Sequence, residues 1–371
     1  MHNVRVCSEH SGGRDLIASV KANAYGHGVV EVSRLLDSAG VSTLWTGSFE
    51  DALAVRDAGV DARILMFAGA LPSAMGELLS AGVVPTIVNL AAAEAVSAAA
   101  TKPTSVCVKI DCGFGRLGAR VDKGGLELLQ AVHALPNVSL DCIYTHLPFA
   151  DREGLAWAMA GTAAFAQLVD ELDQAGIPRP TIIQAGASGE VLTQSVQPVD
   201  TAVCVGHALY GIDPFTTLGL GGEAPLQNGD TRVVLASIKS CLIHIMQHDG
   251  VADRYLDTGL HYIGAAAKGS SDSLVTLGII PYGLGDGARV AVPGQTTVVV
   301  VRGVKLPVVS VSLEYTTIDL SSCPEASLGD EVTVMGEAAG ISIQQWSAFA
   351  GVSPLEMLTS VGGRMPTVIV E

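Results

Sequence analysis

The strongest constraint on the fold of this chain is a regular alternation of short apolar runs and longer helical segments over its first 222 residues. Several of the helical segments end in Gly, as helices often do. The apolar runs occupy residues 16–21, 42–47, 63–68, 84–89, 105–111, 140–146, 181–186 and 201–206. Eight strand and helix repeats are the number found in a TIM (β/α)8 barrel, so we predict this barrel for residues 1–222.

After residue 222 the pattern changes to strand-like runs separated by turns, with little helical period. We expect strands within residues 233–246, 273–283, 288–294, 296–320 and 330–336, and one short helix at 342–351. Such a series is typical of a mostly antiparallel β domain. The predicted fold is therefore an α/β barrel followed by a C-terminal β domain at residues 223–371, with a polar linker at 221–225.

The amino-acid composition limits the kinds of partner that this protein can bind. The 371 residues include 37 acids and 21 bases, for a formal net charge of -16, and no run of Lys and Arg. Nucleic acids and anionic membrane surfaces require basic clusters, so we exclude both as partners. No apolar stretch reaches the ~20 residues of a spanning helix. The polar N-terminal segment is unlike a signal peptide, so we expect a cytoplasmic protein.

Seven cysteines are present, with no CxxC pair and no zinc-like spacing, so we expect buried thiols and no metal site. The useful polar residues stand where predicted barrel strands end, because barrel active sites lie at the carboxyl ends of the strands. They are Lys21, Lys109, Asp111, Arg116, His146, Ser188, Gly206 and His207. A lysine is costly to bury at such a place unless it forms a Schiff base or pairs with a charge.

Five motifs, in order along nearly the whole chain, resemble one family. VKANAYGHG at 20–28 is similar to the pyridoxal-phosphate lysine signature of the alanine racemase family, a fold-type III barrel followed by a β domain. The other four are KIDCGFGRLG (109–118), THLPFAD (145–151), VGHALYG (205–211) and GDEVTVMG (329–336). The resemblance implies an isomerase that interconverts L- and D-amino acids, alanine or a somewhat larger one, by proton exchange between two bases at Cα.

The resemblance assigns the cofactor-binding residues of the barrel. Lys21 would hold pyridoxal 5'-phosphate covalently and act as the base on one face of Cα. Tyr25, Ser188 and the backbone amides of Gly206 and His207 would bind the phosphate, since glycine admits an anion closely.

The remaining assignments concern the ring and the substrate. His146 would lie against the cofactor ring, and Arg116 would face the cofactor hydroxyl and the substrate carboxylate. Lys109 matches a lysine that is carbamylated in many members, and charge pairing with Asp111 explains it equally well. Tyr262 matches the base of the opposite face, which the family supplies from the partner subunit. A head-to-tail homodimer with shared sites is therefore implied.

One departure from the family pattern concerns the cofactor ring. Cys204 stands where the family usually places an arginine against the pyridine nitrogen. An arginine holds that nitrogen unprotonated, whereas a neutral thiol imposes no such charge constraint. The hypothesis is that Cys204 permits another reaction of the amino acid, such as aldol cleavage, elimination or decarboxylation. A further departure is Ala187, which replaces an asparagine before Ser188.

Other departures fall in the β domain and at the N-terminus. SLEY at 312–315, whose Leu313 the resemblance places at the substrate, replaces CMDQ. Leu284 and Gly363 stand where members carry a gate tyrosine and a phosphate-contacting tyrosine. These changes predict a more open, apolar entrance and a substrate larger than alanine. The chain also begins about ten residues late relative to the family, so we expect a first strand to be absent.

Two alternatives from other classes remain. Residues 113–118 form a GxGxxG that could be a dinucleotide fingerprint, but it follows the fifth repeat, whereas that fingerprint belongs to the first βα turn. A non-catalytic pyridoxal-phosphate-binding protein is the second alternative. Such single-barrel relatives resemble only the barrel half, so the β domain with Tyr262 favours an enzyme.

Overall fold

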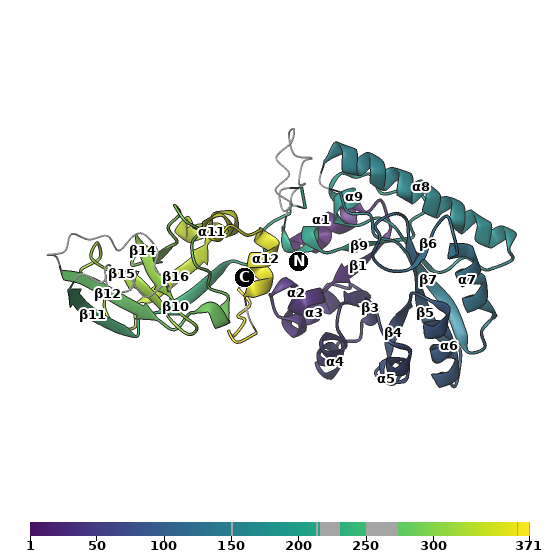
Figure 1. Cartoon of the computed structure of the whole chain (residues 1–371), viewed down its shortest axis with the longest axis horizontal. Coiled ribbons are helices and arrows are strands. Elements are labelled where there is room, and N and C mark those ends of the chain that lie inside the picture. Colours follow the sequence, from purple (N-terminus) through teal and green to yellow (C-terminus); the bar gives the residue numbers. More distant parts are fainter. Residues whose placement is uncertain (150, 213, 216–230, 250–273, 362, 371) are drawn as a thin grey trace. The chain divides into compact units, whose positions relative to one another are not determined.

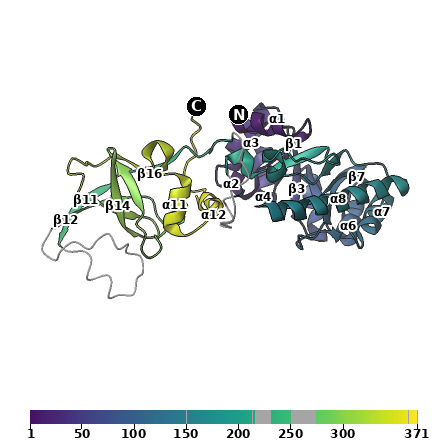
Figure 2. The ribbon, with the colours of Figure 1, turned by 90° about the horizontal axis from the view of Figure 1, so that it is seen from above.

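The computed structural model describes residues 1–149, 151–212, 214–215, 231–249, 274–361 and 363–370. The chain divides into two compact units, Met1–Val233 and Val234–Glu371, which are drawn in Figures 1 and 2 and described separately below. The predicted domain boundary at residue 222 falls within 216–230, outside the described residues. It therefore stays a prediction.

Eight parallel strands form the wall of the first unit (Figure 1). They are β1 (Asp15–Ser19), β2 (Thr43–Thr46), β3 (Arg63–Gly69), β4 (Val83–Ile87), β5 (Thr104–Asp111), β7 (Val138–Tyr144), β8 (Ile182–Gln184) and β9 (Ala202–Val205). Their hydrogen-bonded order is β8-β7-β5-β4-β3-β2-β1-β9, and a bridge between Ala187 and Cys204 joins the two ends. The predicted barrel is confirmed, and each strand overlaps its predicted run. A short β6 (Ala119–Arg120) pairs with β5.

Helices and helical turns surround these strands (Figures 1 and 2), and the turn at Lys21–Tyr25 is left-handed, with φ of 52–53° at Ala22, Asn23 and Ala24. They are α1 (His2–His10), α2 (Lys21–Tyr25), α3 (Val29–Ser38), α4 (Phe49–Asp57), η1 (Pro72–Ala74), α5 (Met75–Ser80), α6 (Leu90–Ala99), α7 (Gly125–Ala134), α8 (Arg152–Gln174), α9 (Ser188–Leu192) and η2 (His207–Tyr210). Side-chain caps start several of them: Ser48, Asn89 and Asp151 each accept a backbone N–H of the first turn. The segment before β1 is helical, and residues 1–14, all described, contain no strand.

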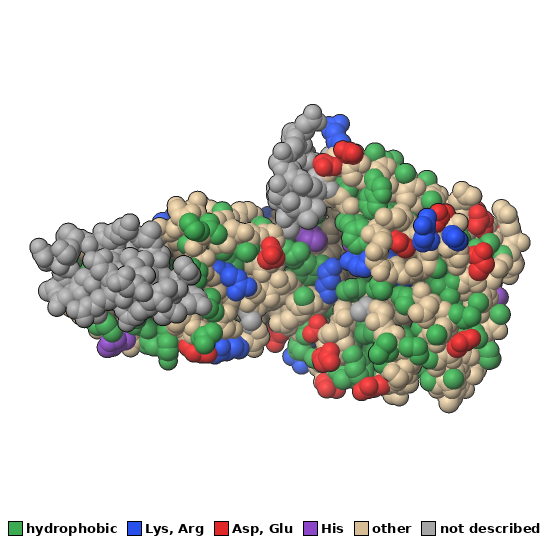
Figure 3. Space-filling model, in the orientation of Figure 1, with side chains coloured by type: hydrophobic (Ala, Val, Ile, Leu, Met, Phe, Trp, Pro, Cys, Tyr) green, Lys and Arg blue, Asp and Glu red, His purple; other side chains and the backbone are tan. Residues whose placement is uncertain are grey.

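Charged side chains are interspersed on the surface of the first unit. On the face shown in Figure 3, acidic side chains are spread out and basic ones stand among them. On α8, for example, Arg179 following the helix forms ion pairs with Asp170 at 2.7 Å and Asp173 at 2.8 Å. Within the described ranges, no helix combines the length and apolar character needed to cross a membrane.

The barrel is filled by side chains that point inward from alternate positions of its strands. This inner cluster contains Ile17, Trp45, Leu65, Cys107, Cys142, Tyr144, Ile182 and Ala202, with Phe67, Val84 and Cys204 packed against it. Because inner positions repeat every second residue, the series that runs through Cys107 continues to Lys109 on β5. The series through Ala202 reaches Cys204 on β9. The strand period thus brings these two side chains to the inner face near the carboxyl ends.

Seven antiparallel strands form the second unit, in the order β10-β16-β13-β14-β15-β12-β11. They are β10 (Ser237–Cys241), β11 (His244–Asp249), β12 (Leu274–Ile280), β13 (Val298–Val301), β14 (Val304–Val311), β15 (Thr316–Asp319) and β16 (Glu331–Gly336). A short helix η4 (Leu284–Asp286) lies between β12 and β13, and another, η5 (Glu337–Ala339), follows β16. The predicted antiparallel β domain is confirmed.

The predicted strand at 288–294 is wrong. Pro293 has no backbone N–H, and Gly294 adopts a positive φ of 86°, so the segment turns. The amide of Val292 donates to the carbonyl of Phe349 on α11 (Ile343–Ala350) at 2.9 Å, so the segment packs on a helix and joins no sheet. That helix is the predicted one at 342–351. A second helix, α12 (Pro354–Ser360), was not expected, although its Ser353 and Glu356 form a capping box.

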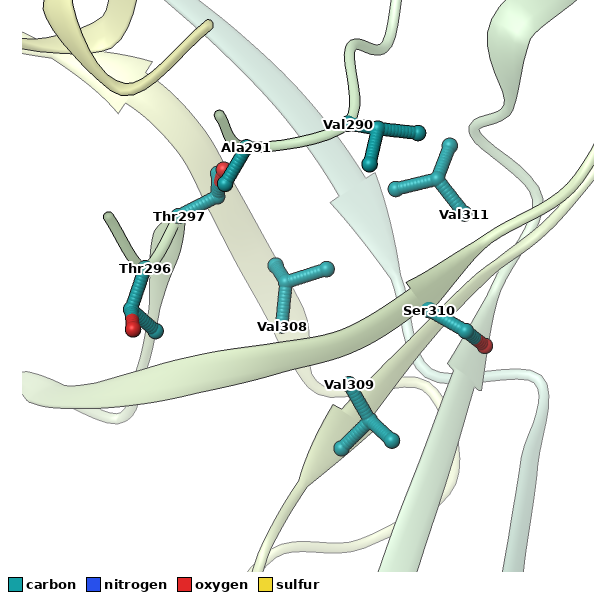
Figure 4. A pocket seen from close by; sticks show the side chains of 8 residues that line it. All are labelled: Val290, Ala291, Thr296, Thr297, Val308, Val309, Ser310 and Val311. Atoms are coloured by element: carbon teal, nitrogen blue, oxygen red, sulfur yellow. The ribbon is translucent and has the colours of Figure 1, made fainter. Parts of the chain in front are cut away.

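A small apolar hollow lies beside β14 in this unit (Figure 4). It is lined by Val290, Ala291, Thr296, Thr297, Val308, Val309, Ser310 and Val311. None of these side chains is an acid, a base or a strong nucleophile, so the hollow offers no group for chemistry at Cα. Ionisable side chains gather instead where the barrel strands end.

Candidate active site

The residues after β1 form a left-handed turn that carries Lys21. Four consecutive residues after it, Ala22 to Tyr25, have φ of 52°, 53°, 53° and 55°. This conformation costs roughly 1–2 kcal/mol per residue, and such strain is characteristic of functional sites. The turn is held by the amide of Val29, which donates to Asn23 Oδ1 at 2.8 Å. It leaves Lys21 Nζ 5.6 Å from the Tyr25 ring centroid and 5.5 Å from that of Phe67.

Tyr25 is buried, and its hydroxyl points at the backbone of Gly206. A Cβ built on Gly206 would lie 2.2 Å from Tyr25 Oη, so only glycine admits this approach. Burial raises the pKa of Tyr25, and the neighbouring Lys21 partly offsets this rise. The ring of Tyr210 packs 4.6 Å from that of Tyr25, and its hydroxyl donates to the Ser19 carbonyl. The fold therefore requires the glycine of VGHALYG.

Ser188 lies at the meeting point of the loops that follow β8 and β9. Its hydroxyl oxygen accepts the amides of Gly206 at 3.0 Å and Ala208 at 3.2 Å. The structure thus brings Ser188, Gly206 and Tyr25 together. The second amide on Ser188 is that of Ala208, and the contact of the His207 amide with a phosphate stays a prediction. No sequence signal distinguishes these amides, because the turn of η2 decides which N–H points inward.

His207 lies on the other side of the Tyr25 ring, with the two ring centroids 5.8 Å apart. Burial, followed by the charge of Lys21, lowers the pKa of His207 to about 4. The imidazole is therefore neutral at pH 7. The His207 ring thus contacts Tyr25 and lies within electrostatic range of Lys21.

Lys109 is 5% exposed, and its Nζ lies 4.6 Å from the centroid of the Tyr144 ring. Burial, and next the charge of Arg116, lowers the pKa of Lys109 to about 7. No described carboxylate lies at ion-pair distance from Lys109. The Asp111 carboxylate faces the following loop instead, where it accepts the amides of Gly113, Phe114 and Gly115 at 2.9–3.2 Å.

The glycines of the GxGxxG at 113–118 have local structural roles. Gly113 and Gly115 adopt φ of 111° and 77° in the loop around Asp111. At Gly118 a Cβ would lie 2.3 Å from the backbone oxygen of Lys109. Backbone conformation and close packing therefore account for these three glycines, and dinucleotide binding is not needed to explain them.

His146 and Arg116 both contact the ring of Phe114, a residue that was not among the candidates from sequence. The Phe114 ring is edge-on to His146 at 5.5 Å, and the Arg116 guanidinium carbon lies 4.8 Å from its centroid. Burial, followed by the charges of Lys109, Arg116 and Lys21, lowers the pKa of His146 to about 3. The imidazole is neutral, so the charges that meet here are those of the lysines and the arginine.

Cys204 is half-buried at the last inner position of β9, opposite Ile17 of β1 in register. Burial raises the pKa of Cys204 to about 12, although Lys21 and Lys109 act in the opposite direction. The side chain is therefore a neutral thiol between two amines. Below it the rings of Trp45 and Tyr144 meet at 4.5 Å, from strands on opposite sides of the barrel. This pair closes the interior beneath the site.

The described candidates in the second unit lie on connected loops. Leu313 is 70% exposed. The amide of Leu284 donates to the carbonyl of Ser312 at 2.9 Å, and Arg364 pairs with Glu314. Three of the family departures, at 283–287, 312–315 and Gly363–Arg364, therefore belong to one neighbourhood. Tyr262 lies in 250–273, outside the described residues.

Comparisons with known proteins point to one family along the chain. The family model described as alanine racemase, N-terminal domain, matches residues 1–214, and the model of the alanine racemase C-terminal domain matches 260–369. An alanine racemase of Thermodesulfovibrio yellowstonii is 30% identical over 364 residues, covering 94% of this chain and 88% of its own length. One of Desulfosudis oleivorans is 28% identical over 367 residues, with coverage of 95% and 89%.

Solved structures show the same architecture. An alanine racemase from Clostridium difficile 630 superposes with a TM-score of 0.82 at 22% identity, over 98% of this chain and 91% of that one. The biosynthetic alanine racemase from Pseudomonas aeruginosa gives a TM-score of 0.70 at 26% identity, over 98% and 95%. The barrel followed by an antiparallel β domain is therefore a shared fold.

Proposed function

The chain belongs to the alanine racemase family, and from this we propose that it is a pyridoxal-phosphate-dependent racemase of alanine or a somewhat larger amino acid. One observation carries the proposal: the amine of Lys21, the hydroxyls of Tyr25 and Ser188, and the backbone of Gly206 converge at the ends of β1, β8 and β9. Barrels commonly bind phosphate on the loops after their last two strands, and β8 and β9 are the last two here.

The described residues fit the proposed cofactor. The close approach of Tyr25 Oη to Gly206 forms a cradle that any Cβ would fill. The Ser188 oxygen accepts the amides of Gly206 and Ala208, and its O–H would donate to a phosphate. Pyridoxal phosphate, when bound, makes the substrate Cα–H acidic by delocalising the resulting charge. Lys21 would provide the amine for covalent attachment.

The charges of the barrel residues suit anionic groups. The charges of Lys21, Lys109 and Arg116 all lower the pKa of His146. All three side chains therefore lie close enough to His146 to act on it electrostatically. Their field favours a phosphate and a carboxylate. We assign Arg116 to the substrate carboxylate, since its planar fork can donate two hydrogen bonds. His146, which is neutral, would pack against the ring without adding charge.

Proton exchange requires two bases. We assign the first to Lys21, at the Cα face nearest β1, and the second to Tyr262 of a partner subunit in a head-to-tail homodimer. Tyr262 falls within the C-terminal family match at 260–369. That match also favours an enzyme over a non-catalytic barrel that only binds the cofactor. Leu313 would border the substrate.

Lys109 is the proposed carbamylation site. Its pKa of about 7 leaves a large neutral fraction at pH 7, and only a neutral amine reacts with carbon dioxide. A carbamate there would be an anion between Arg116 and the other bases. A new carbamate carbon signal after addition of 13C-bicarbonate, absent in Lys109→Met, would support it.

A second candidate function is favoured by Cys204. Its neutral thiol places no fixed charge beside the cofactor, so elimination, aldol cleavage or decarboxylation of an amino acid is the alternative. We expect Cys204→Arg to raise the ratio of racemised product to side product, as measured by chiral chromatography and mass spectrometry. An unchanged ratio would count against a role of Cys204 in reaction choice.

The experiment that tests the proposal incubates the cofactor-loaded protein with L- and D-amino acids in D2O. α-Hydrogen exchange is followed by NMR, and chirality is measured on the same samples. Exchange with loss of chirality establishes a racemase and identifies its substrate. Formation of a carbonyl product, or of an amine with release of carbon dioxide, indicates the alternative. Lys21→Ala is the matched control and should show neither.

A further inference from the structure

Two buried acids hold the loop that carries Ser188. Residues 185–187 connect β8 to α9, and their three amides point to carboxylates. Asp200 Oδ1 accepts the amide of Ala185 at 2.5 Å and that of Gly186 at 3.0 Å. Glu190 Oε2 accepts the amide of Ala187 at 2.9 Å. The sequence analysis singled out neither acid.

These carboxylates are costly to keep where they are. Glu190 is 6% and Asp200 5% exposed, and neither forms an ion pair with a described base. Buried carboxylates are unfavourable unless hydrogen bonds satisfy them. Backbone amides satisfy Asp200 Oδ1 and Glu190 Oε2, whereas Asp200 Oδ2 is buried without a hydrogen-bond partner among the described residues. Burial raises the pKa of both groups, that of Glu190 to about 7. A surface cap on α9 would avoid this cost, so the burial requires another explanation.

The loop that the acids hold is also bound to β9. The Gly186 carbonyl accepts the amide of Cys204 at 3.0 Å, and the Gln184 side chain donates to the same carbonyl at 3.0 Å. The next residue but one is Ser188, whose hydroxyl meets the amides of Gly206 and Ala208. Every backbone amide from 185 to 187 is therefore tied down immediately before the hydroxyl that must face the phosphate.

We propose that Glu190 and Asp200 are positioning residues for the phosphate site, because they fix the 185–187 loop and so hold the Ser188 hydroxyl against the amides after β9. This inference rests on the proposed function, in that the phosphate is the one of pyridoxal phosphate. Neither acid touches the phosphate in this account. Their effect on the phosphate is transmitted only through the backbone of residues 185–187. It therefore depends on a hydrogen-bond acceptor at each position and not on a negative charge.

The test compares Glu190→Gln, which keeps an acceptor oxygen, with Glu190→Leu, which removes it at similar size. Dissociation constants are measured for pyridoxal phosphate and for pyridoxal, which lacks the phosphate. We expect Glu190→Leu to weaken pyridoxal phosphate binding about tenfold, the effect of one lost hydrogen bond, and to leave pyridoxal binding within about twofold. Glu190→Gln should stay within about threefold of wild type for both.

Three results would overturn the inference. Glu190→Leu could bind pyridoxal phosphate like the wild type, or lose both ligands equally, or Glu190→Gln could lose as much as Glu190→Leu. Should Glu190→Leu not fold, hydrogen exchange of the wild-type protein decides: the amides of 185–187 should be protected without cofactor, and rapid exchange contradicts the inference. Failure of wild type to take up pyridoxal phosphate contradicts the proposed function itself, whereas equal uptake by all variants contradicts this inference alone.

Discussion

The candidate residues of the barrel and those of the β domain differ in their surroundings. In the barrel all of them except the exposed Arg116 are buried or half-buried, and burial shifts the pKa of Lys109, His146, Cys204 and His207. In the β domain, Leu313 is largely exposed on a loop. Three of the departures from the family pattern, at Leu284, 312–315 and Gly363, also fall on β-domain loops. The contrast suggests that the barrel provides the chemistry and the loops select the substrate.

The largest expected effect comes from removing the amine of Lys21 in the barrel. Lys21→Ala should lower racemisation by at least about a thousandfold, because covalent attachment and one base are lost together. The exposed Lys305 of the β domain provides the control, and Lys305→Ala should retain activity within about twofold. Racemisation rates and cofactor absorbance measure both. Near-normal turnover by Lys21→Ala would break the assignment of the chemistry to the barrel.

The next effect concerns the one base that we assign to the β domain. Tyr262→Phe should slow turnover by about 10²–10⁴-fold, since a general base contributes that much. Lys21 should still exchange the α-proton of the one enantiomer whose Cα–H faces it. In D2O, therefore, only that enantiomer should incorporate deuterium. Lys305→Ala, at an exposed β-domain site outside the 283–287 and 312–315 loops, is the control. Equal loss in both directions would point to a structural role for Tyr262.

The third prediction concerns the stability of the barrel. The pKa of Lys109 in the folded chain is about 7, below its ordinary value of 10.5. Between these values the unfolded chain binds more protons, so the free energy of unfolding rises with pH by about 1.4 kcal/mol per unit. From pH 7 to 9 this amounts to about 2 kcal/mol.

Urea unfolding in carbon-dioxide-free buffer measures this dependence. Lys109→Met should stabilise the protein most at pH 7 and progressively less toward pH 9. Lys305→Met, at an exposed site, should give a difference that does not vary with pH. A pH-independent effect of Lys109→Met would mean that the amine is not held neutral in the folded barrel.

The smallest effect concerns substrate choice by the β domain. Leu284→Tyr should shift the preference between alanine and a larger amino acid by about tenfold toward alanine, because added volume at an entrance costs about 1–3 kcal/mol per group. kcat/KM for both substrates measures the shift. Leu328→Tyr, at an exposed β-domain position, should leave the ratio unchanged. A shift toward the larger substrate would reverse the role proposed for the loops.

The eight barrel strands, and the polar residues at their ends, could be predicted from local pattern. Inner positions repeat every second residue, so a run such as 105–111 already implies that Lys109 faces inward. The helix at 342–351 was equally local, with a Ser cap and a terminal Gly. The strand predicted at 288–294 was wrong although its local pattern is strand-like. Pro293 and the hydrogen bond from Val292 to Phe349 prevent this segment from pairing with a sheet.

Partners that meet across chain distance were decided by the tertiary structure alone. The amide of Ala208 donates to Ser188, the Phe114 ring contacts both Arg116 and His146, and Asp200 holds amides 14 and 15 residues away. These contacts arise because closing the barrel brings the loops after β8 and β9 together. Sequence period determines which side of a strand a residue occupies. Which backbone amide finds a partner depends on strand order and loop geometry, which no local pattern encodes.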